Sequence, residues 1–224
     1  MNDNKANTKN IFNQLGNIIK TNIRYIITLF SIIFLLFISF QFYNFYNSNK
    51  IQNNSIDFFS LYSLDSSKIN KDLVISLSKE KNFYGILSKL ELIDIYYSEN
   101  NFQNIISLYK ELLSNNKLAP VYKTAIATKA SYNMLNINFD DMKNNYSETI
   151  KDFISHIDEN LIAYQGIKLE LNYLSKILEI EMNNDQYKDS KEILKLYDSI
   201  ITSEIVSNAI KERIKKIHEF YIYK

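Results

Sequence analysis

The chain has 224 residues, with 26 Lys and Arg against 25 Asp and Glu, no Cys, no Trp, two His, three Gly and one Pro. This length allows one or two small domains. The absence of Cys excludes disulfides, Fe–S clusters and thiolate chemistry, and the near-zero net charge argues against a dedicated nucleic-acid-binding protein. So few Gly and Pro residues also disfavour a β-sandwich or barrel, which needs frequent turns.

The first predicted element is an apolar helix over residues 25–46. Thirteen of the nineteen residues in 25–43 are Ile, Leu or Phe, and none is charged. Nineteen helical residues rise about 28 Å, close to the ~30 Å hydrocarbon thickness of a bilayer. Bulky aromatic residues follow this stretch, whereas a signal-peptide cleavage site needs small ones. The sequence therefore predicts a permanent single-pass membrane anchor.

The charges that flank this helix predict its orientation. Residues 1–24 carry four basic residues against one acidic residue. The positive-inside rule then places 1–24 in the cytoplasm and everything after the span across the membrane. For a bacterial chain this gives a cytoplasmic N-terminus at 1–24, an inner-membrane anchor at 25–46, a linker at 47–54 and a periplasmic domain at 55–224.

The exported region is predicted to be a series of helices separated by Asn residues, because Asn tolerates the left-handed conformation that ends a helix. Between these points, apolar residues recur at a spacing of three and four. The breaks are expected at the pairs Asn53 and Asn54, Asn100 and Asn101, Asn115 and Asn116, Asn144 and Asn145, and Asn183 and Asn184. The expected helices are 55–64, 67–79, 82–98, 101–115, 119–136, 141–155, 159–183, 186–201 and 203–222, with Pro120, Asp140 and Ser203 near helix starts.

Two stretches of this region show a weak internal repeat. Residues 92–112 can be set against 177–197 at an offset of 85, with large residues at matching places and an aromatic residue after each turn. This spacing resembles the tetratricopeptide pattern of stacked helical hairpins. Ile105 stands where the pattern usually has Ala, and Glu181 stands where it has an aromatic residue. Generic helical hairpins without repeat ancestry remain the alternative.

The whole plan resembles the ancillary SecYEG translocon subunit family, in its alphaproteobacterial form. The local similarities are 83–90 (FYGILSKL), at the start of the first hairpin, and 119–125 (APVYKTA), at the start of the following helix. The resemblance implies an all-α chain with one transmembrane helix and a tetratricopeptide-like domain of helical hairpins, an α-solenoid. It also implies a bitopic inner-membrane protein beside the Sec channel, whose periplasmic domain contacts exported polypeptides or periplasmic chaperones.

Motifs for chemistry are sparse. His156 and His218 lie on different predicted helices without a flanking carboxylate spacing typical of a metal site. The three glycines are scattered, so no phosphate-binding loop can form. Asp140 and Asp141 precede a helix and are interpreted as cap and dipole partners, and the Tyr clusters as packing. The sequence predicts no catalytic residue, metal or cofactor, and no nucleic-acid or small-molecule ligand, so an enzyme is disfavoured.

A recognition surface is predicted on the concave face of the hairpins, which the first helix of each hairpin lines. Its candidate residues are Leu87, Leu90, Asp94, Tyr97, Asn172, Glu179 and Met182. Leu90 and Asp94 occupy places where a carboxylate-clamping domain would have Lys and Asn, so that ligand class is disfavoured. Weak apolar contact with extended or helical segments fits better, with Met182 and Tyr97 as adaptable members. Coverage of some of these side chains by the helices at 55–79 is the alternative.

Two functions are consistent with these features. The first is a membrane-anchored, non-catalytic interaction module that assists the Sec translocon. The alternative is an anchored scaffold in envelope assembly or in the coordination of cell division, because the same domain type serves both pathways.

Overall fold

The computed structural model describes residues 3–62, 70–140, 144–183, 187 and 190–223, with the side chains of 3–19, 26 and 140 left aside. The regular secondary structure of these residues is α-helical throughout, which confirms the predicted all-α class. The chain divides into two compact units, Met1–Gly85 and Ile86–Lys224, and each is described by itself.

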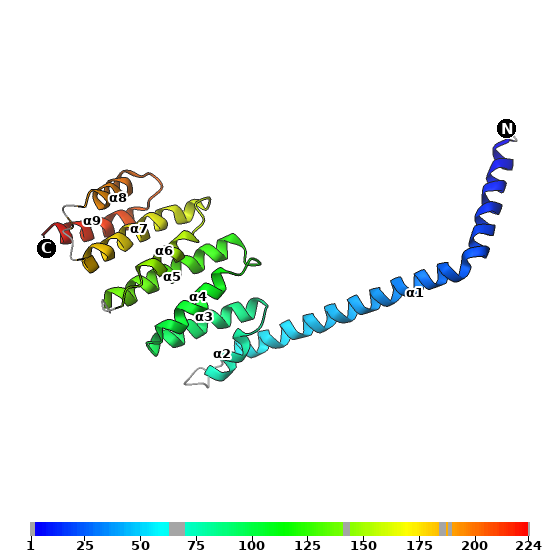
Figure 1. The fold of residues 1–224 in the computed structure, drawn as a ribbon, viewed down its shortest axis with the longest axis horizontal. Helices are drawn as coiled ribbons and strands as arrows, with labels where there is room; N and C mark the ends of the chain where they lie inside the picture. Colours follow the sequence, from blue (N-terminus) through cyan, green and yellow to red (C-terminus); the bar gives the residue numbers. More distant parts are fainter. Residues whose placement is uncertain (1–2, 63–69, 141–143, 184–186, 188–189, 224) are drawn as a thin grey trace. The chain divides into compact units, whose positions relative to one another are not determined.

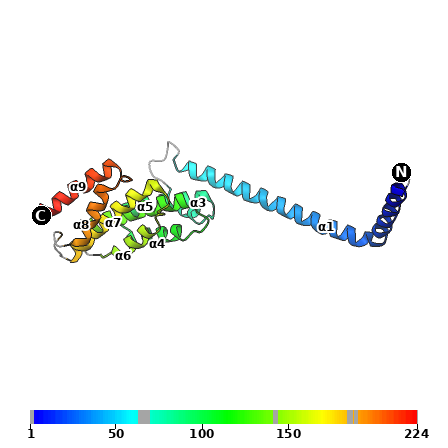
Figure 2. The same ribbon diagram turned by 90° about the horizontal axis from the view of Figure 1, so that it is seen from above.

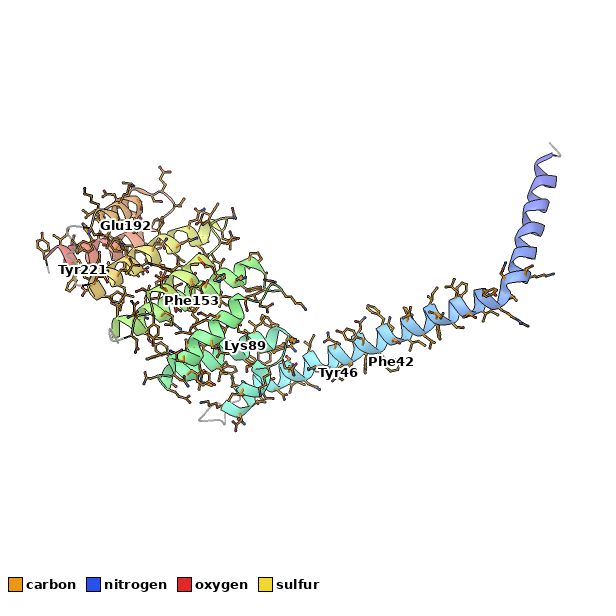
Figure 3. All side chains as sticks on the ribbon, viewed as in Figure 1. Phe42, Tyr46, Lys89, Phe153, Glu192 and Tyr221 are labelled. Carbon is orange, nitrogen blue, oxygen red and sulfur yellow. The ribbon has the colours of Figure 1, made fainter. Side chains whose placement is uncertain are left out.

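The first unit is dominated by helix α1, Asp3–Ser60 (Figure 1). Within the described residues, its stretch 20–60 is the one helix long enough and apolar enough to cross a membrane. The apolar side chains of the predicted span are largely exposed, for example Phe30 at 67% and Leu36 at 66%. Phe42 and Tyr46 likewise project from α1 and are 72% and 70% exposed (Figure 3).

Helix α1 continues without interruption through the stretch predicted to be a linker. The break expected at Asn53 and Asn54 is wrong, since the helix ends only at Ser60. Asn54 and Phe58 are buried in this part of α1, and Lys50 forms an ion pair of 2.7 Å with Glu80. Tertiary packing of this face explains why the weak helix formers do not end the helix.

The end of α1 packs against α2, Lys71–Ser78, whose Val74 and Leu77 are buried. The rings of Phe58 and Tyr84 lie beside each other, with centroids 6.0 Å apart. A Cβ on Gly85 would lie 1.9 Å from the carbonyl oxygen of Glu80, so only glycine fits there. The stretch 83–90, noted for its family resemblance, therefore contains a close backbone approach at Gly85.

The second unit contains most of α3 and all of the helices that follow it. Their bounds are α3 Phe83–Ser98, α4 Phe102–Leu113, α5 Pro120–Asp140, α6 Ser147–Ser155, α7 Ile162–Asn183, α8 Lys191–Thr202 and α9 Asn208–Tyr223. From α4 onward each helix packs on the next one in the chain, and α7 also packs on α5 and α9 (Figure 2). Ser203, expected to start the last helix, instead caps the C-terminus of α8.

Asparagine ends α3 as the sequence predicts. Asn100 has a φ of 56°, and the backbone N–H of Asn101 donates to the carbonyl of Tyr96 at 2.9 Å. This is the bond pattern of a left-handed C-cap in which Asn replaces Gly. The side chain of Asn101 then accepts from the N–H of Asn104 and caps α4. The helix start expected at Asp140 is wrong, because α5 extends through Asp140 and α6 begins only at Ser147. Asp141 lies outside the described residues.

Two clusters of buried side chains hold the second unit together. The first core extends over α3 to α7 and includes Ile93, Ile105, Tyr109, Met134, Ile150, Phe153 and Leu171. The second core joins α7, Tyr187, α8, the loop after it and α9, and comprises Tyr173, Ile177, Ile180, Tyr187, Ile193, Ile200, Val206, Ile210 and Ile214.

Burial matches the predicted repeat at one pair of positions and departs from it at another. Leu92 and Ile177 are both buried, as an offset of 85 requires. Ile105 is fully buried, but its expected counterpart Ser190 is the N-cap of α8. The buried residue in the equivalent place is Ile193, three residues later. The stretch between α7 and α8 is longer than the one between α3 and α4, which shifts the register.

Candidate functional site

The predicted recognition residues divide into two sets on two helices. The α3 set is Leu87, Leu90, Asp94 and Tyr97, and the α7 set is Asn172, Glu179 and Met182. Spacings of three, four and seven place each set along one face of its helix. No hydrogen bond, ion pair or ring contact joins the two sets among the residues that the structure describes. The structure thus brings the residues together within each set and not across the sets.

In the α3 set, Asp94 and Tyr97 are exposed, whereas the two leucines are half-buried. Lys129 of α5 donates to both carboxylate oxygens of Asp94, at 2.9 and 3.0 Å. Tyr97 is 37% exposed. Leu87 and Leu90 are half-buried, and Leu90 packs against the first core. Asp94 and Tyr97 are therefore the members of this set that remain accessible to a partner.

Glu179 of the α7 set belongs to an ion-pair network between helices. It accepts from Lys151 of α6 at 2.5 Å and from Lys176 at 3.1 Å, and Lys176 also pairs with Glu192 of α8 at 2.6 Å. Burial raises the pKa of Glu179, but the two ammonium groups together outweigh it, so the pKa lies below its usual value. The charge of Glu179 is thus engaged in holding α6, α7 and α8 together.

Met182, the other end of the α7 set, makes internal contacts. Its sulfur lies 3.9 Å from the side-chain nitrogen of Asn138 and 3.7 Å from the hydroxyl of Ser147. Asn138 is fully buried and binds the backbone at both Asn144 and Tyr146. Met182 therefore contacts both α5 and α6. Its role as an adaptable contact residue stays a prediction, as does that of the half-buried Asn172.

A buried carboxylate on α7 was missed from the sequence. Glu170, with a side chain 1% exposed, accepts from Arg213 of α9 at 2.6 and 2.8 Å. It also accepts from the hydroxyl of Tyr132 on α5 at 2.7 Å. Burial, followed by the bond to Glu170, raises the pKa of Tyr132, so the hydroxyl remains a donor. The only signal in the sequence is one Glu between two Leu residues on an apolar face.

A chain of hydrogen bonds in the second core was also missed. The hydroxyls of Tyr173 and Tyr187 are 2.6 Å apart, and that of Tyr187 is 2.5 Å from Nδ1 of His218. The ring of His218 stacks on Tyr197 with centroids 3.7 Å apart, and Tyr187 stacks on Tyr221. Burial lowers the pKa of His218. Tyr221, which the sequence predicts to serve packing, stacks on Tyr187.

Neither a candidate metal site among the described residues nor a similar known protein indicates a function for this chain. Within the described residues, no group of three or more His, Asp or Glu could hold a metal ion. Comparison of the chain with protein-family models, with curated proteins and with solved structures yields no match.

Proposed function

We propose that the chain is a non-catalytic, single-pass membrane protein whose helical region after α1 binds other polypeptides beside the Sec translocon. The observation that carries the proposal is the exposure of the apolar side chains of α1. Transfer of thirteen Ile, Leu and Phe residues into a bilayer gains about 4–8 kcal/mol as an upper limit. Water is an unfavourable surrounding for such a surface, and a bilayer removes the cost.

The continuity of α1 supports a helical extension of the proposed anchor beyond the membrane. Residues 44–60 continue the helix for about 25 Å beyond the apolar stretch 25–43. The ion pair between Lys50 and Glu80 and the burial of Phe58 fix α2 against this part of α1. In the proposed function this part of α1 extends the anchor as a helix that carries α2, and the predicted linker plays no part.

The packing order of the second unit supports the tetratricopeptide-like part of the proposal. Each helix from α4 to α9 contacts the next one in the chain, as consecutive hairpins do. Domains of this kind bind peptides or helices through the faces of their hairpins. The exposed side chains of Asp94 and Tyr97 form the proposed contact surface. The resemblance to the ancillary Sec translocon family is the ground for naming the translocon.

Topology is the first test of this proposal. Protease added to intact spheroplasts should remove 55–224, and the same region should be protected in inverted membrane vesicles. Leu36→Arg should reduce membrane insertion, because Arg at the centre of a span costs about 2.5–3.5 kcal/mol, while the matched variant Leu36→Ala should insert normally. The opposite protease pattern would overturn the orientation and the export function with it.

Partner capture is the second test. A photo-crosslinking residue at Tyr97 should capture SecY or exported chains in growing cells. The same residue at Phe220, which is also exposed but lies on α9, is the control and should capture neither. Equal capture at both positions, or none at Tyr97, would contradict the proposed surface. Capture of cell-division proteins, with localisation at the division site, would favour the alternative scaffold.

A further inference from the structure

Helix α9 is attached to the rest of the second unit at two polar points. In its first half, Arg213 holds the buried carboxylate of Glu170. One turn and more further along, His218 contacts Tyr187 and Tyr197. The guanidinium of Arg213 does not lose its proton in any ordinary pH range, whereas an imidazole changes charge near neutrality. The two points must therefore respond differently to acid.

The hydrogen bonds of the second point have a definite direction. Tyr173 is fully buried, and in the part of the chain that the structure describes its hydroxyl has one partner, Tyr187. The hydrogen of Tyr173 is satisfied only if it is donated to Tyr187, because a buried donor without a partner is costly. Tyr187 then donates its own hydrogen to Nδ1 of His218. This order requires a neutral ring with its proton on Nε2.

Protonation of His218 reverses this order. Nδ1 then carries a hydrogen and can only donate, so Tyr187 must accept from it. The two contacts then have three hydrogens to hold, so the hydrogen of either Tyr187 or Tyr173 has no acceptor left among the described residues around it. The protonated ring and the closed chain of hydrogen bonds are therefore incompatible.

We propose that His218 is an acid-sensitive latch: protonation of its ring breaks the chain through Tyr187 and Tyr173 and releases the part of α9 after Arg213 from α7 and α8. The released part would uncover the apolar side of the second core, to which α9 contributes Ile214. The first half of α9 stays in place because the guanidinium of Arg213, which holds Glu170, keeps its charge over this pH range.

The groups around His218 determine the pH at which the end of α9 is released. Burial, the largest influence, lowers the pKa of the ring, while Asp198 of α8 and Glu219 of α9 raise it, and the pKa stays below 6.5. From α7, Tyr173 faces the same cluster and Glu181 binds Tyr221. A released His218 binds a proton more readily than a latched one, so release is favoured as the pH falls below about 6.5.

Hydrogen exchange of the full chain in detergent micelles tests the latch. Amides of 214–223 should lose protection severalfold between about pH 7.5 and about pH 5, after correction for intrinsic rates, because the proton binds the released ring more tightly than the packed one. Amides of α5 in the first core should keep their protection over the same range. An unchanged protection of 214–223 would overturn the proposal.

Two substitutions of His218 should have opposite effects. His218→Asn keeps an acceptor for Tyr187 without a titrating group, so the end of α9 should stay protected at both pH values. His218→Phe keeps a ring on Tyr197 but removes the acceptor, so protection should be low at both. His156→Asn, at the other histidine of the chain, is the matched control and should keep the acid response. An acid response that survives in His218→Asn would overturn the proposal even if His218→Phe unfolds.

Discussion

The two cores of the second unit differ in the hydrogen bonds that their buried tyrosine hydroxyls form. In the first core Phe153 packs on Tyr109, and among the described residues the buried Tyr109 hydroxyl accepts one hydrogen bond, from Asn133 at 2.8 Å. The second core contains a directional chain of hydroxyls and lies beside the buried Glu170. Apolar packing supplies stability that pH does not alter, whereas the polar contacts of the second core fix the position of α9 at the cost of dependence on partners.

The largest expected effect breaks the first core. Phe153 is fully buried and meets Tyr109 edge to face with ring centroids 5.8 Å apart. Phe153→Ala should lower the free energy of unfolding by about 3–5 kcal/mol, because it removes a large apolar side chain and leaves a cavity. Chemical denaturation of the full chain followed by circular dichroism measures this loss. Phe220→Ala, at an exposed ring on α9, should change it by less than about 0.5 kcal/mol.

The second prediction concerns the asymmetry of the ion pair between α7 and α9. Arg213 is 54% exposed, whereas Glu170 is buried. Arg213→Ala should cost about 3 kcal/mol in the free energy of unfolding, because it leaves an unpaired buried carboxylate. Glu170→Gln should cost about 1 kcal/mol, since the amide still accepts a hydrogen bond and the guanidinium can be solvated. Equal costs in the same denaturation measurement would contradict the burial argument.

The sequence predicted the helices far better than the connections between the two cores. Periodic apolar residues and Asn punctuation located α3 to α8, because both signals are local. The pairs Glu170 with Arg213 and Tyr187 with His218 are long-range, and a single chain gives no indication of which helices meet. The break at Asn53 failed for the same reason, since packing on α2 overrides local preference there.

The candidate site could be predicted only in part. Asp94 and Tyr97 are both exposed and share one face of α3, which helix periodicity alone indicates, while their part in recognition stays a prediction. The internal contacts of Glu179 and Met182 depend on α6 lying against α7, which the spacing within α7 does not show.

The third prediction compares one buried tyrosine in each core. Tyr187→Phe should cost about 2 kcal/mol, because both Tyr173 and His218 lose their partner while the ring can still stack on Tyr221. Tyr109→Phe should cost about 1 kcal/mol, because a single bond to the half-buried Asn133 is lost. Thermal denaturation of the two variants side by side measures the difference. A larger loss for Tyr109→Phe would show that the polar chain contributes little.

The smallest expected effect separates the two acidic residues of the candidate site. Asp94→Asn should change the free energy of unfolding by about 0.3 kcal/mol, because its pair with Lys129 is exposed. Glu179→Gln should cost about 1 kcal/mol, because that side chain is 20% exposed and binds two lysines. The comparison requires denaturation curves at neutral pH and at about pH 3.

The pH dependence of the two variants sharpens this last comparison. Because folding lowers the pKa of Glu179, its contribution to stability is fully present above 4.5 and is lost as the pH falls through the folded-state pKa. The cost of Glu179→Gln should therefore shrink in acid, and a cost that stays constant would rule out the ion pairs as its source. If Asp94→Asn leaves stability unchanged but abolishes crosslinking at Tyr97, the carboxylate of Asp94 serves recognition. The carboxylate of Glu179, in contrast, stabilises the fold.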